Sequence, residues 1–159
     1  MNRRPPAAPL GSGPTRAARL RAPLLLALGI TLAFEAAGGL WLFAARLLVG
    51  SSPGVALHVG GGLALNVLYA AYQWGHWRRV RPFRARLDHA LGLIAALAIV
   101  CTQLSGLWLG ALWWRSRAAG IVDYPPLLSA AHNIFSMLVL TFTGAHLGAV
   151  LMRDRSPAR

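Results

Sequence analysis

The chain has 159 residues, of which 56% are hydrophobic and 13% are charged. Soluble domains carry about a quarter charged residues, so this composition is typical of a single domain that folds in a lipid bilayer. The net charge of +12 would suit a nucleic-acid partner. We expect none, because membrane topology accounts for the basic residues, as described below.

Residues 1–22 are rich in Pro, Ala, Gly and Arg and have no apolar periodicity. We expect a disordered cytoplasmic tail there, because such a composition cannot bury enough apolar surface to fold. The apolar stretch that follows is too long for the core of a secretory signal. It should therefore remain in the protein as a membrane anchor.

Four stretches almost without charge follow this tail, and each is long enough for the ~20 residues that cross a bilayer. We predict membrane-spanning helices over residues 23–46, 54–77, 89–114 and 126–152, and a short cytoplasmic tail over 153–159. Short connections between such helices make sequential neighbours antiparallel. The expected fold is therefore all-α, an integral membrane four-helix bundle with up-down topology.

The arginines are distributed unevenly between the two sides of this bundle. Thirteen of the sixteen lie before the first span, between the second and third spans, or after the fourth. Only Arg46, Arg115 and Arg117 lie on the other side. Because positive charge accumulates in cytoplasmic loops, both termini should lie in the cytoplasm. We expect a multi-pass protein of a bacterial plasma (inner) membrane, with the lipid bilayer around its spans.

Histidines lie within the spans, where polar side chains are costly and mark functional sites. His132 and His146 are 14 residues apart, which places them on one face of the fourth span, ~21 Å apart along its axis. His58 lies near the start of the second span, which runs in the same direction, at a depth similar to that of His132. A lone histidine in a span is more often a packing residue. Two imidazoles that face each other across a bundle, however, are the axial ligands of haem b, and we predict such a site at His58 and His132.

A second haem site would use His146, and its partner remains open between three residues. Tyr72 lies 14 residues after His58 and can face His146, but a phenol is a poor partner in a bis-imidazole site. His76 is one turn further along and reaches His146 only if the helices tilt or slide by ~6 Å. His89, at the start of the third span, is the third alternative. We expect one haem b and keep a second as an alternative.

Three stretches of the chain have a recognisable pattern of histidines: LHVGGGLALNVLYAAYQWGHW at 57–77, TQLSGLWL at 102–109 and AHNIFSMLVLTFTGAHL at 131–147. In these stretches, and together with the first span, the chain resembles the flavinylation-associated cytochromes. This is a family of small four-helix membrane b-type cytochromes, formerly a domain of unknown function. The resemblance implies haem b held by His58, His132 and His146. It also implies electron transfer across the membrane, often towards extracytoplasmic flavoproteins. The chain departs from the family pattern at Tyr72, where a histidine is expected, and His76 is its most plausible replacement.

Other polar residues allow more than one role. Glu35 is the only acidic residue well inside a span, which suggests a proton relay, a quinone site, or a hydrogen bond to a histidine or a backbone carbonyl. The three arginines on the outer side could bind haem propionates or lipid headgroups. Cys101 is the only cysteine, and the chain contains no C-x-x-C-H motif. These facts exclude an internal disulfide and a covalent c-type haem.

The sequence therefore predicts a membrane b-type cytochrome that passes single electrons through bis-histidine haem. The donor would be the quinol pool or a cytoplasmic protein, and the acceptor an extracytoplasmic protein such as a flavoprotein. Such a chain is an electron-transfer subunit rather than a complete enzyme. The alternative is a cofactor-free membrane anchor, assembly subunit or small transporter, whose histidines pack or handle protons. A transporter should contain broken helices or internal repeats.

Overall fold

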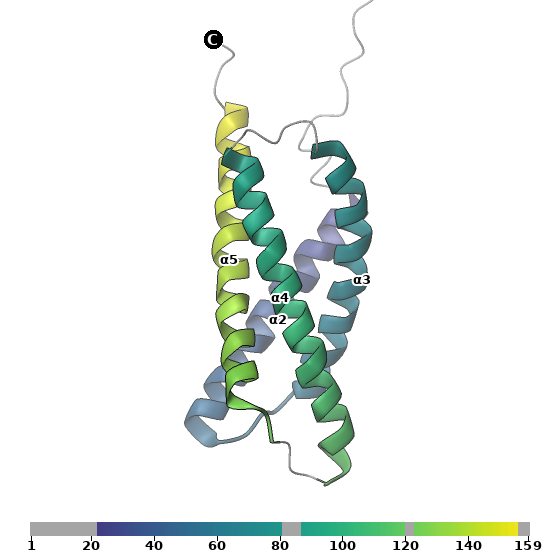
Figure 1. Cartoon of the computed structure of the whole chain (residues 1–159), viewed down its shortest axis with the longest axis vertical. Coiled ribbons are helices and arrows are strands. Elements are labelled where there is room, and N and C mark those ends of the chain that lie inside the picture. Colours follow the sequence, from purple (N-terminus) through teal and green to yellow (C-terminus); the bar gives the residue numbers. More distant parts are fainter. Residues whose placement is uncertain (1–21, 81–86, 120–122, 156–159) are drawn as a thin grey trace, which may run out of the picture.

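The computed structural model describes residues 22–80, 87–119 and 123–155 (Figure 1). Nearly all of them lie in four long helices: α2 (Pro23–Val49), α3 (Val55–Val80), α4 (Leu87–Ser116) and α5 (Pro126–Arg155). A short 3-10 helix, η2 (Arg117–Ala119), extends α4. These described ranges contain no β-strand. The expected all-α four-helix fold is confirmed, whereas the expected tail over residues 1–22 lies outside the described residues except at its last position.

All four helices are long and apolar enough to cross a membrane. They correspond to the four predicted spans and extend beyond them at several ends. α2 continues to Val49, and α5 continues to Arg155, three residues into the predicted C-terminal tail. Helices continue past the apolar boundary because a helical backbone satisfies its own hydrogen bonds in any solvent. A multi-pass protein in contact with the lipid bilayer follows from these four helices.

Two glycines shape the turn between α2 and α3. Gly50 has a φ of 68° and ends α2, and its N–H donates a hydrogen bond to the carbonyl of Arg46 at 3.2 Å. Gly54 has a φ of 87° immediately before α3 begins. Glycine adopts positive φ without the steric cost of a Cβ atom, so it suits both positions. The turn reverses the chain and starts α3 beside α2.

The bundle consists of two antiparallel hairpins. α4 packs most closely on α5, and α2 packs on α3, while α3 and α5 make little direct contact. In Figure 1, α2 lies behind, α4 lies in front, and α3 and α5 stand on opposite sides between them. α3 and α5 are the two helices with the paired histidines. Side chains rather than backbone contacts therefore bridge these two helices.

Few side chains are buried, and they lie near the middle of the bundle. The best-buried apolar residues include Tyr69 of α3, Ala95 and Ala98 of α4, and Val139 of α5. Most large apolar side chains are exposed, as expected for helices that face lipid. The buried layer lies between the early and the late histidines of α3 and α5. It therefore separates two regions of the bundle interior.

Candidate haem-binding histidine pairs

The first histidine pair, called site 1, consists of His58 on α3 and His132 on α5. Their ring centroids are 6.3 Å apart, and the ring planes cross at 76°. Both residues are partly buried. The structure thus brings together the two residues that helical geometry predicted at matching depth.

The second pair, called site 2, consists of His76 on α3 and His146 on α5. Their ring centroids are 6.4 Å apart, and the ring planes cross at 88°. The spacing along the chain is 18 residues on α3 and 14 on α5, an offset of ~6 Å. Divided between the two sites, this offset is ~3 Å at each, which the histidine side chains can span. Among the three open partners for His146, the structure selects His76.

The separation of the rings fits a metal ion between them. A bond from an imidazole nitrogen to a first-row transition metal is about 2 Å long. Two such bonds in line, plus the radii of both rings, give centroids about 6 Å apart. Both measured separations have this value, and the bridged helices, α3 and α5, are loosely packed on each other. The residues present therefore fit axial ligation of haem b.

His132 of site 1 is oriented by groups on α4. Its Nδ1 lies 3.1 Å from the carbonyl oxygen of Thr102 and 3.1 Å from Oγ of Ser105. The Ser105 hydroxyl itself donates to the carbonyl of Cys101 at 2.8 Å. A protonated Nδ1 that donates to the Thr102 carbonyl leaves Nε2 as the metal-binding nitrogen. These two partners were not expected, because sequence alone does not show which α4 side chains face α5.

Glu35 of α2 approaches His58 of the same site. Its Oε2 lies 2.8 Å from Nδ1 of His58, although the angle is not that of a straight hydrogen bond. The carboxylate is buried, and Oε1 lies against Gly61, where a Cβ atom would overlap it. A carboxylate next to the non-ligating nitrogen is a common second partner of metal-binding histidine. Of the roles expected for Glu35, this geometry favours contact with a histidine.

Tyr72 contacts His76 and does not replace it. The Tyr72 hydroxyl lies 3.1 Å from Nδ1 of His76, and the two rings are stacked with centroids 5.1 Å apart. Because the residues are four apart, they lie on the same face of α3. The expectation that Tyr72 can face His146 thus gives way to a supporting role. His89, the third alternative, has no ring contact among the described residues.

The three arginines near the α2–α3 and α4–α5 connections differ in their surroundings. Arg46 lies 5.0 Å from the ring centroid of Tyr124, and Arg117 lies 3.3 Å from that of Trp114. Burial raises the pKa of the Tyr124 phenol, and Arg46 partly opposes this change. The guanidinium groups of Arg46 and Arg117 thus stack on aromatic rings. The prediction that these arginines bind propionates stays a prediction.

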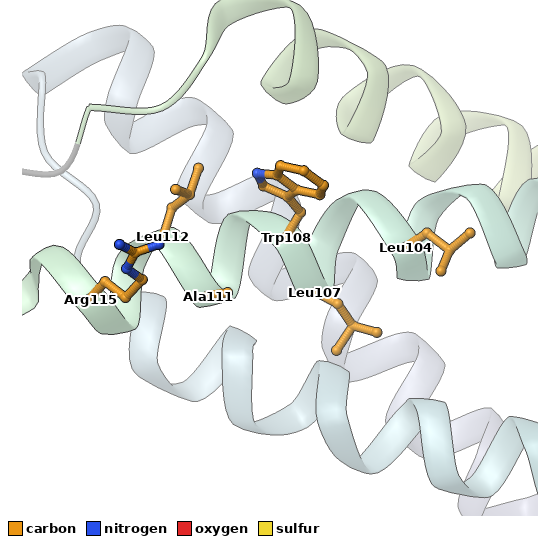
Figure 2. A pocket seen from close by; sticks show the side chains of 6 residues that line it. All are labelled: Leu104, Leu107, Trp108, Ala111, Leu112 and Arg115. Atoms are coloured by element: carbon orange, nitrogen blue, oxygen red, sulfur yellow. The ribbon is translucent and has the colours of Figure 1, made fainter.

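Arg115 lies at one end of a groove on α4 of about 390 Å³. Figure 2 shows the groove along one stretch of this helix, with Leu104 at the other end. Its remaining lining residues are Leu107, Trp108, Ala111 and Leu112. The groove lies on an exposed face and contains none of the paired histidines. It is therefore separate from sites 1 and 2.

Comparison of the chain with protein-family models, with curated proteins and with solved structures gives no match.

Proposed function

We propose that this protein is a membrane b-type cytochrome that holds two haems and passes single electrons along the bundle. One observation carries the proposal. Two separate histidine pairs have ring centroids 6.3 Å and 6.4 Å apart, the separation that bis-imidazole ligation of iron requires. Two independent pairs with the same spacing are hard to explain by packing alone.

The chain's own residues bind, orient and shield the haems. His58 and His132 bind the haem of site 1, and His76 and His146 bind that of site 2. Their partners at Nδ1 fix the tautomer and hold Nε2 towards the iron. The bound haem supplies a carrier that accepts and donates one electron at a time. The buried layer between the sites excludes water from the path of the electron.

The direction of transfer follows from the arrangement of charge. With the arginine-rich loops in the cytoplasm, site 2 lies near the cytoplasmic face and site 1 near the outer face of a bacterial plasma membrane. The sites are ~21 Å apart along α5. Electrons enter from the quinol pool or a cytoplasmic donor and leave to an extracytoplasmic acceptor. The resemblance to flavinylation-associated cytochromes supports a flavoprotein as that acceptor.

Alanine substitution of single histidines tests the proposal. His132→Ala should remove the haem of site 1 and leave site 2, whereas His146→Ala should do the reverse. Each variant should therefore hold one haem per chain, which pyridine haemochrome analysis measures. His89→Ala is the matched control and should keep both haems. Retention of both haems by His132→Ala and His146→Ala would refute the ligand assignment.

A further inference from the structure

Two glycines of α4 lie directly against two of the paired histidines. A Cβ atom on Gly106 would lie 2.9 Å from Cε1 of His132. A Cβ atom on Gly92 would lie 2.9 Å from Cε1 of His146. Contacts this short are sterically unacceptable, so any larger residue would displace the imidazole ring. Each ring of α5 is thus packed against the backbone of α4.

The two contacts repeat with the same register. Gly92 and Gly106 are 14 residues apart on α4, and His132 and His146 are 14 residues apart on the antiparallel helix α5. α4 and α5 are also the most closely packed pair of helices. The hairpin therefore contains two copies of one Gly–His contact, one at each site.

The opposite ring at each site is restrained by different groups. A Cβ atom on Gly39 would lie 3.4 Å from Cε1 of His58, and Glu35 contacts the same ring through Nδ1. At site 2 the Tyr72 ring stacks on His76 with an interplanar angle of 19°. As a result, the two rings of a pair cannot rotate freely into a common plane. They cross at 76° in site 1 and at 88° in site 2.

We infer that Gly106 and Gly92 are positioning residues that hold the axial imidazoles of sites 1 and 2 close to perpendicular. This inference rests on the proposed function. In a low-spin ferric haem, each imidazole plane splits the iron d orbitals that hold the unpaired electron. When two planes are perpendicular these effects oppose each other, and the EPR spectrum becomes strongly anisotropic. Parallel planes give an ordinary rhombic spectrum instead. Ring orientation is thus a property that the chain imposes on the iron through its packing.

EPR spectra of the purified haem-loaded protein test the inference. The wild type should give two strongly anisotropic low-spin signals, assigned to the sites with His132→Ala and His146→Ala. Gly106→Ala should shift the signal and the midpoint potential of site 1 and leave those of site 2. Gly92→Ala should do the opposite. Gly29→Ala is the matched control, because no atom lies within 4 Å of its Cβ position, and it should change neither signal.

Several results would overturn the inference. One is a rhombic wild-type spectrum with two haems bound, which would leave the proposed function intact. Another is wild-type EPR signals and potentials in both Gly106→Ala and Gly92→Ala. If Gly106→Ala does not fold, Ser105→Ala provides a milder change at the same ring, since it removes the hydroxyl 3.1 Å from Nδ1. That variant should alter the signal of site 1 alone, and an unchanged signal counts against the inference. A wild type without haem refutes the proposed function, and the inference with it.

Discussion

Three of the four paired histidines have a polar group at Nδ1, and each group is of a different kind. His58 faces the carboxylate of Glu35, His76 faces the hydroxyl of Tyr72, and His132 faces a backbone carbonyl. A carboxylate gives an imidazole more anionic character than a hydroxyl or a carbonyl does. We therefore expect the haem of site 1 to be tuned chiefly by Glu35.

Glu35→Gln should raise the midpoint potential of site 1. The carboxylate lies 2.8 Å from Nδ1 of His58 and favours the ferric state, whose positive charge it offsets. A tenfold loss of this preference corresponds to about 60 mV for one electron. Potentiometric titration followed at the haem absorption band measures the change, and site 2 is the internal control. An unchanged potential at site 1 would show that Glu35 does not influence the iron.

Tyr72→Phe should weaken haem binding at site 2 and leave site 1 unaffected. The variant keeps the stacked ring but removes the hydroxyl 3.1 Å from Nδ1 of His76. Loss of such a partner typically lowers metal affinity about 10–100-fold. The rate of haem transfer to excess apomyoglobin measures the effect, with one of two haems leaving faster. Equal rates in variant and wild type would contradict a supporting role for Tyr72.

At the scale of elements, the sequence predicts the four helices well because long apolar stretches in lipid have few alternatives to helix. It also predicts the pairing of His58 with His132, since both lie near the starts of helices that run in the same direction. Ideal straight helices cannot decide between Tyr72 and His76, because the outcome depends on how two sites share an offset of ~6 Å. The contacts of Ser105, Gly92 and Gly106 depend on the rotation of α4 relative to α5. The equal 14-residue spacings of glycines and histidines are the one signal that could have indicated it.

The turn between α2 and α3 should be sensitive to substitution of its glycines. Gly50→Ala forces a Cβ atom into a conformation with a φ of 68°, which should cost about 1 kcal/mol. Gly29→Ala, inside α2 with open space around it, should instead stabilise the protein by ~0.5–1 kcal/mol. Thermal denaturation in detergent followed by circular dichroism compares the two variants. The expected order of melting temperatures is Gly29→Ala, wild type, then Gly50→Ala, and the reverse order would contradict the described turn.

At the scale of the whole molecule, the bundle arranges two similar sites one above the other between α3 and α5. Site 1 lies at the end with the α2–α3 turn, and site 2 lies at the end where α3 and α5 finish. Transfer across a membrane requires these ends to face opposite compartments. The proposed function therefore depends on the orientation that the arginines indicate.

Cysteine labelling in intact bacterial cells tests this orientation. In a Cys101→Ala background, Ser51→Cys should react with a membrane-impermeant maleimide, because residue 51 is exposed in the α2–α3 turn. Trp77→Cys, exposed near the opposite end of α3, should react only after the cells are lysed. The opposite pattern would place site 1 at the cytoplasmic face and reverse the proposed path.

The most direct measurement is a dithionite-reduced minus oxidised spectrum of the purified protein, with haem quantified per chain. Two bis-histidine sites predict a low-spin b-type spectrum with about two haems per chain. The two should separate in a redox titration, because Glu35 lies beside site 1 alone. A folded preparation, produced with ample haem, that contains none would contradict the account. The paired histidines would then be packing residues of a cofactor-free membrane protein.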